Sequence, residues 1–170
     1  PFLNYQGTDT PPHTLGWVNN IKVQNFNLTA IFVGKMGGVY RNPTFSYSTT
    51  VGYDKTFVNK YISDVLAGNP NIPGFGNPDE TKLYLWDRYT PALSSLVESS
   101  SYVELKELTL EYRLSKKLAK AIQVNNVKVF AQTRDLGMIW HANTKGYNPD
   151  WLPGTNRPVQ SYTFGVNLQF

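Results

Sequence analysis

The side chains that most often perform catalysis are few in this sequence and far apart. The two histidines, His13 and His141, stand alone, and neither has a second ligand at the spacing of a metal site. The serines of 99–101 lack the histidine and carboxylate pattern that would activate a serine nucleophile. We therefore expect no enzymatic activity, no bound metal and no cofactor.

Calcium binding is a second chemistry to consider, because three carboxylates fall in one loop-like stretch. Asp79, Glu80 and Asp87 offer the oxygen ligands that calcium prefers, but their spacing is not that of a calcium-binding loop. Solvated side chains are the simpler interpretation. The chain contains no cysteine, which excludes disulfides and thiolate-bound zinc.

Aromatic residues are the third group, and they are nearly as frequent as charged residues. An aromatic ring has an apolar face and polar edges, so it can stack on a sugar ring. It can also line a membrane interface or pack one loop against another, and the sequence favours these structural roles. The loop aromatics for which substrate contact is the competing interpretation are Trp86, Tyr89, Trp140, Tyr147 and Trp151.

Strands are the elements that must position these side chains. Apolar and polar residues alternate with the period of two that strands have, in the segments of about 15–24, 26–37, 102–114, 126–135 and 160–170. Each segment has roughly ten residues, about what a tilted strand needs to cross a bilayer and about twice the length of a typical soluble strand. Helical spacing appears only near 57–66 and in the short stretch 115–122. The chain is therefore expected to be all-β.

The connections between these segments alternate in length. A tight turn at Gln24 and Asn25 is followed by a long connection of about 38–101, a short helical link, and a second long connection of about 136–159. Short turns at one end and long loops at the other are typical of an outer-membrane barrel. On that pattern the short connections lie in the periplasm and the two long loops lie outside the cell.

One face of the last three strands carries only aliphatic, aromatic or small uncharged residues. A soluble β-sandwich would show the same alternation, but the strand lengths and the loop asymmetry favour a membrane barrel. A cation that faces lipid at mid-bilayer costs about 2–4 kcal/mol, so the charged face must line the lumen. Ile31 and Val33 would then also point inward. The charged residues predicted to face the lumen are Glu111, Arg113, Lys128 and Arg134.

Five strands cannot close a barrel, because single-chain bacterial barrels have an even number of strands, about eight at the fewest. An open sheet would leave two unpaired edges in hydrocarbon, where each unpaired backbone group costs several kcal/mol. We therefore expect the chain to be the C-terminal part of a larger transmembrane antiparallel β-barrel. The net charge of +4 comes from dispersed lysines, so nucleic-acid binding is not expected.

Five stretches of the sequence resemble the SusC/RagA family of TonB-dependent outer-membrane transporters. SYVELKELTLEYRLSKKLAKAI resembles the family's "SYvRLKNltLgYtlPkkl", and VNNIKVQNFNLTAIFVGKMGG its "NNTfsYKnFdLs…fsyGg" hairpin. NPNIP, KGYNPD and SYTFGVNLQF resemble the family's "NPNTdiP", "kGyDPE" and closing "tYtfGlnltF". The matches occur in family order over most of 16–170, although Glu104 and Glu107 depart from the family pattern.

The resemblance implies a barrel of about 22 strands with a plugged lumen, of which these would be the last five. It also implies a bacterial outer-membrane location, a SusD-like surface lipoprotein as lid, and TonB-dependent import of oligosaccharides or peptides. The plug and the TonB-binding part would lie outside these residues. The five loop aromatics would then contribute to the lid contact or to the substrate vestibule.

The last ten residues resemble the C-terminal signal that the barrel-assembly machinery reads. Its alternate apolar positions are Tyr162, Phe164, Val166, Leu168 and Phe170. The alternative from another class is a secreted all-β carbohydrate-binding module, in which the aromatic residues would form a binding platform.

Overall fold

The computed structural model describes residues 4–44, 55–69 and 87–169, and these divide into two compact units. One, which we call the sheet unit, comprises His13–Met36, Tyr102–His141 and Pro158–Phe170. The other, the loop unit, comprises Pro1–Pro12, Gly37–Ser101 and Ala142–Arg157. No helix in the described ranges has both the length and the apolar character needed to cross a membrane.

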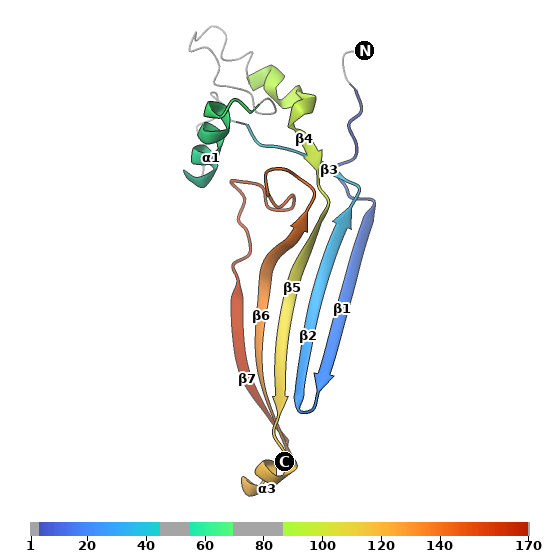
Figure 1. Ribbon diagram of the computed structural model, residues 1–170, viewed down its shortest axis with the longest axis vertical. Helices are drawn as coiled ribbons and strands as arrows, with labels where there is room; N and C mark the ends of the chain where they lie inside the picture. Colours follow the sequence, from blue (N-terminus) through green and yellow to red (C-terminus); the bar gives the residue numbers. More distant parts are fainter. Residues whose placement is uncertain (1–3, 45–54, 70–86, 170) are drawn as a thin grey trace. The chain divides into compact units, whose positions relative to one another are not determined.

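The sheet unit is one antiparallel sheet of five long strands, which lie side by side in Figure 1. They are β1 (His13–Val23), β2 (Phe26–Met36), β5 (Tyr102–Arg113), β6 (Asn126–His141) and β7 (Ser161–Gln169), in the order β1-β2-β5-β6-β7. The all-β class expected from the alternation is confirmed. Neighbours in the sheet are also neighbours along the chain once the long connection between β2 and β5 is set aside.

The two connections at one end of the sheet are short. Val23 pairs with Phe26, so the hairpin of β1 and β2 turns through Gln24 and Asn25, and Gln24 has a φ of 53°. Helix α3 (Lys116–Ala121) links β5 to β6, and Figure 1 shows it beyond the ends of both strands. The carbonyl of Ser115 accepts hydrogen bonds from the backbone N–H of Leu118 and of Ala119, whereas the Ser115 side chain forms no cap.

Strand β6 continues to His141, past the end at about 135 that the sequence predicts. The register between β5 and β6 shifts near Lys106, and on β6 Asp135 and Gly137 have positive φ angles of 56° and 104°. These are the features of β-bulges, which interrupt the alternation without ending the strand. We expected Trp140 in the second long loop, and this prediction is wrong, because Trp140 is a residue of β6.

The two faces of the sheet differ in chemistry, and neither is covered within the described part of the sheet unit. Its buried apolar residues are few: Ala119, Val124 and Val127 form one small cluster near α3, and Tyr102 is buried at the other end of β5. Large apolar side chains are exposed along the strands instead: Leu15, Trp17, Ile21, Val23, Phe26, Leu110, Tyr162, Phe164, Val166 and Leu168. A water-soluble sheet would bury that face under a second layer.

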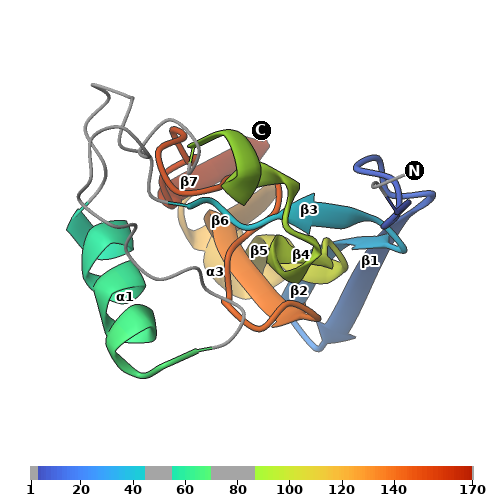
Figure 2. The ribbon, with the colours of Figure 1, turned by 90° about the horizontal axis from the view of Figure 1, so that it is seen from above.

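The loop unit contains the elements that the long connections form. The short strands β3 (Val39–Arg41) and β4 (Val97–Ser99) pair with each other, and two 3₁₀ helices, η1 (Thr90–Ala92) and η2 (Ser94–Leu96), precede β4. Helix α1 (Lys55–Leu66) lies apart from β3 and β4 within this unit, as Figure 2 shows. The helix predicted near 57–66 is thus present, and Gly68, with a φ of 67°, follows its end.

Candidate functional site

The polar face of the sheet carries a chain of paired charges near its middle. The register places Glu107 opposite Arg134 on β6, and the two form an ion pair with 3.0 Å between Oε2 and Nε. Gln132 Nε2 donates to Glu107 Oε1 at 2.7 Å, and the Thr109 hydroxyl donates to the same oxygen at 3.2 Å. One carboxylate therefore accepts from three side chains on two strands.

A second ion cluster is built on the bulge in β5. Lys106 Nζ lies 3.1 Å from Glu104 Oε2 and 3.5 Å from Asp135 Oδ1. Glu104 is buried, and a buried carboxylate without a cation would be costly. Lys106 is an extra residue on β5 relative to β2, and it supplies that cation. Glu104 is therefore a structural residue of the sheet.

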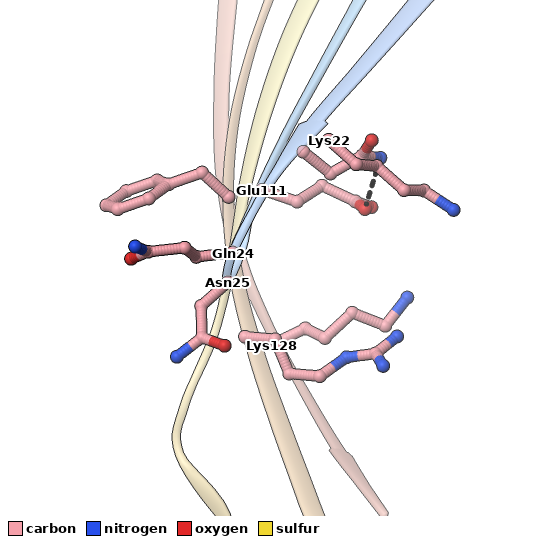
Figure 3. A pocket seen from close by; sticks show the side chains of 8 residues that line it. Lys22, Gln24, Asn25, Glu111 and Lys128 are labelled. Carbon is pink, nitrogen blue, oxygen red and sulfur yellow. Dashed lines mark hydrogen bonds between the residues drawn. The ribbon is translucent and has the colours of Figure 1, made fainter.

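The end of the polar face near the tight turn is different, because its positively charged side chains form no ion pair with a described carboxylate. Glu111 accepts a hydrogen bond from Asn27 Nδ2 at 3.1 Å. Lys22, Arg113 and Lys128 lie beside it and form no ion pair with any described residue. Figure 3 shows the side chains of Lys22, Glu111 and Lys128 pointing to the same side. Together with Gln24, Asn25, Phe26 and Asn27 these four charged residues line a cavity of about 300 Å³.

The four residues predicted to face the lumen therefore share one face of the sheet. The consecutive pairs on that face are Arg113 with Lys128, Glu111 with Phe130, Thr109 with Gln132 and Glu107 with Arg134. Ile31 lies on it too, because it pairs with Glu107.

Phe130 occupies a position on this polar face that the sequence analysis left without a role. Its partner on β7 is Gly165, and a Cβ built on Gly165 would lie 2.4 Å from Phe130 Cε1. The ring therefore lies over the glycine, where any larger residue would collide with it. Aromatic residues cover strand glycines in this way and shield the exposed backbone. The pairing of the two could not be read from either strand alone.

The apolar face contains the candidate assembly residues of β7. Tyr162 and Phe164 are 65% and 78% exposed, and Val166 and Leu168 are exposed as well. Phe170 lies outside the described residues. A shallow apolar groove of about 180 Å³ follows this face, lined by Leu108, Leu110, Ala131, Gln132, Thr133, Tyr162 and Phe164.

Two aromatic pairs lie on the same face at different positions along the strands. Phe26 and Tyr112, next to the tight turn, have ring centroids 4.7 Å apart. Trp17 and Phe32, further along β1 and β2, are stacked at 5.2 Å. Aromatic rings therefore lie on this face both next to the tight turn and further along the strands.

In the loop unit, polar contacts join α1 to the segment 142–157. Lys145 Nζ forms an ion pair with Asp64 Oδ2 at 2.6 Å, and Lys60 Nζ donates to the carbonyl of Lys145. The Lys60 ammonium also lies 4.7 Å from the centre of the Tyr147 ring. Burial raises the pKa of the Tyr147 hydroxyl, and the carboxylates of Asp64 and Glu98 raise it further. Tyr147 is therefore a neutral residue held within the network.

Glu98 is the second polar centre of the loop unit. Its carboxylate accepts from Asn42 Nδ2 at 2.6 Å, from the Thr144 hydroxyl at 2.8 Å and from the Thr144 backbone N–H. Burial and the Glu98 carboxylate also raise the pKa of the Tyr40 hydroxyl. These bonds tie β3 and β4 to the segment after β6, so the loop unit has a fixed, largely polar interior.

The five loop aromatics are not assembled into one surface. Tyr89 is 60% exposed beside η1, and Tyr147 packs under the Lys60 ammonium. Trp151 is half-buried and forms a β-bridge with Asn148. Trp140 belongs to the sheet unit, and Trp86 lies outside the described residues. No ring contact joins any two of these aromatics within the described ranges.

The expected absence of a metal site remains a prediction. Among the residues that the structure describes, no group of three or more histidines and carboxylates lies close enough to hold a metal ion. Asp79 and Glu80, two of the three calcium candidates, lie outside those residues.

Comparison with known proteins finds solved structures with a similar fold. No protein-family model matches the chain, and no curated protein matches it. The RagAB peptide importer in its "closed-closed" state matches 98% of this chain at 20% identity with a TM-score of 0.64. Its "open-open" state matches 95% at 20% identity and a TM-score of 0.58, and another RagAB peptide transporter structure matches 98% at 21% and 0.61.

This chain spans only 17–18% of the length of the chains that it matches. At such identities the likeness concerns the fold, and it extends over both the sheet unit and the loop unit because nearly the whole chain is covered. The chain therefore has the fold of one part of those much longer transporter chains.

Proposed function

We propose that the chain is the C-terminal barrel segment of an outer-membrane nutrient importer of the SusC type. In this proposal the five strands cross the outer membrane, with the apolar face toward lipid and the charged face toward the lumen. The full-length protein imports oligosaccharides or peptides in a TonB-dependent manner, under a SusD-like lipoprotein lid. The names of the similar structures favour peptides.

The observation that carries the proposal is the exposed apolar face of the sheet. Burying one large apolar side chain stabilises a soluble protein by about 1.5–3 kcal/mol. On this face many large apolar side chains are exposed, so in water each would lack that stabilisation. Hydrocarbon removes that cost, because the side chains then contact lipid. The opposite face carries ion pairs and unpaired cations, which would be expensive in lipid and are stable in a wet lumen.

The edges of the sheet support a longer barrel. Strands β1 and β7 each have one neighbour in the described sheet, so each has a row of backbone groups without a partner there. In hydrocarbon such groups must be paired. Strands from the rest of the longer chain would pair with β1 and with β7 to close the cylinder, and the apolar positions of β7 would serve as the assembly signal.

The loop unit would face the outside of the cell in this proposal. Tyr89 is the aromatic best placed to contact a substrate or a lid, because its ring is exposed and free of the networks that hold Tyr147. The rival function, a secreted carbohydrate-binding module, would require several rings on one surface. Of the five loop aromatics, those that the structure describes do not form such a surface, which favours the importer.

The test is made on the full-length protein that contains this chain. It should be found in the outer-membrane fraction, require detergent for extraction and purify with a surface lipoprotein when it carries an affinity tag. Cells that lack it, and cells that lack TonB, should both lose uptake of labelled peptides or oligosaccharides. Recovery of the protein from the medium, monodisperse in plain buffer, would refute the proposal.

A further inference from the structure

The three unpaired cations at the tight-turn end of the polar face distinguish it from the rest of that face. Elsewhere in the described sheet, Arg134 has Glu107, and Lys106 has Glu104 and Asp135. Here Lys22, Arg113 and Lys128 stand beside one carboxylate, Glu111, whose hydrogen bond comes from Asn27. The cavity that they line therefore has a surplus of positive charge.

The arrangement is unfavourable as it stands. Arg113 and Lys128 are directly opposite each other on neighbouring strands, and like charges at such positions destabilise a sheet. Lys22 adds a third cation two strands away from Arg113. An anion between these side chains would turn the repulsion into attraction.

The spacing of the cations indicates what kind of anion fits. They lie on β1, β5 and β6, so the outer two are three strand spacings apart, about 14 Å. A single phosphate or carboxylate could contact all three only if the long side chains converged on one point. An extended polypeptide segment with two or more acidic residues can contact them without such convergence, because its side chains are spaced along the backbone.

We infer that this cavity binds an acidic polypeptide segment contributed by the part of the longer chain outside these 170 residues. The inference rests on the proposed function, since it places the polar face toward the interior of a barrel. The similar transporter chains are more than five times as long as this one, so a longer chain of that kind has many further residues that could supply such a segment. Lys22, Arg113 and Lys128 bind the carboxylates of that segment, and Glu111 keeps its hydrogen bond from Asn27.

The first arm of the test measures amine reactivity in the folded full-length protein, in outer membranes or in detergent. An ammonium beside a carboxylate keeps its proton, and only the unprotonated amine reacts with acetic anhydride, so Lys22 and Lys128 should be acetylated about tenfold more slowly than a solvated lysine. Lys117 on α3 is the matched control, because it is exposed and lies in the same unit. Mass spectrometry of the digest gives the rate at each lysine.

The second arm identifies the occupant. A water-soluble carbodiimide should join Lys22 or Lys128 to an aspartate or glutamate outside this segment, and Lys128→Gln should remove only the cross-link made by Lys128. Acetylation of Lys22 and Lys128 at the rate of Lys117 would overturn the inference. So would cross-links only to carboxylates of these 170 residues, or slow acetylation that disappears when lipid or phosphate is removed. Each of these results can be obtained from a protein shown to be in the outer membrane, so the inference can fail while the proposed function stands.

Discussion

The loop unit and the sheet unit place their polar and apolar side chains differently. The loop unit encloses polar residues, among them Asn42, Thr90, Ser100, Asn143, Lys145 and Asn148, around a few apolar ones such as Leu96. The sheet unit exposes most of its large apolar side chains and carries charges on one face, where only some of them form ion pairs. Buried polar groups that find partners, as Lys145 does in Asp64, are typical of a structure surrounded by water.

On the proposed function, the difference reflects two surroundings, which are hydrocarbon for the sheet unit and water for the loop unit. Hydrogen bonds and ion pairs hold the loop unit together, and it needs no hydrocarbon. Among the described residues of the sheet unit, the one apolar cluster lies near α3, so these residues do not cover the exposed apolar face. Substitutions of the same kind should therefore have different consequences in the two units.

The largest effect is expected for a cation placed on the apolar face. Phe164→Arg should destabilise the full-length protein by about 2–4 kcal/mol if the position is near the bilayer centre, because the guanidinium would face hydrocarbon. Thr163→Arg is the matched control on the next residue of β7, where the side chain points to the polar face. Urea unfolding of both variants in lipid vesicles measures the difference. Equal tolerance of both substitutions would show that lipid does not contact this face.

A smaller loss is expected from breaking the ion pair of the loop unit. Asp64→Asn leaves Lys145, whose side chain is 7% exposed, without its counter-charge. Removing one partner of a buried pair costs about 3–5 kcal/mol, and we expect about 2 kcal/mol here because Asp64 is partly open to solvent. Faster hydrogen exchange in 142–157, with unchanged exchange in β5, would show that the effect stays within the loop unit.

The double variant is the control for this prediction. Asp64→Asn combined with Lys145→Met removes both charges, so it should lose less stability than Asp64→Asn alone. If the double variant is the less stable of the two, the Lys145 side chain contributes by packing and the ion pair is unimportant.

Gly165→Ala tests the packing on the polar face of the sheet. The new Cβ would displace the Phe130 ring, and we expect a loss of about 1–2 kcal/mol from this overpacking. In a Phe130→Ala background the same change should cost much less, because the ring is gone. Unfolding of the four proteins in vesicles gives the coupling energy. Independent effects of the two substitutions would mean that the ring moves aside freely.

The sequence was sufficient to predict the strands of the sheet unit, because alternation over ten residues is a strong signal. It failed at the end of β6, where the bulge at Asp135 and Gly137 shifts the alternation, so the remaining strand looks like loop. In the loop unit it predicted α1 from its apolar spacing. It could not predict η1, η2 or the pairing of β3 with β4, because these depend on contacts between distant segments.

The candidate site shows the same limit. Which charges share a face follows from the alternation, so Glu111 and Arg113 could be grouped from the sequence. Which charges are paired depends on register, and register depends on the bulges. The unpaired state of Lys22 and Lys128, and the contact of Phe130 with Gly165, therefore appear only in the folded sheet.

The smallest loss of stability is expected from breaking the Glu107–Arg134 ion pair on the polar face. The size of the loss depends on how much solvent reaches that face. Glu107→Gln should cost about 0.2–1 kcal/mol, since Arg134 is more than half exposed and solvent screens the pair. The difference in the free energy of unfolding between wild type and variant should decrease as salt is raised from about 0.1 to 1 M, because the screening length falls from about 10 to 3 Å. Thr109→Val, which removes a neutral donor to Glu107, is the control and should show no such salt dependence. A loss of 3–5 kcal/mol that salt does not change would show instead that Glu107 and Arg134 are buried by the rest of the barrel. The sheet unit would then resemble the loop unit in its charges, and the two units would differ only on the face that meets lipid.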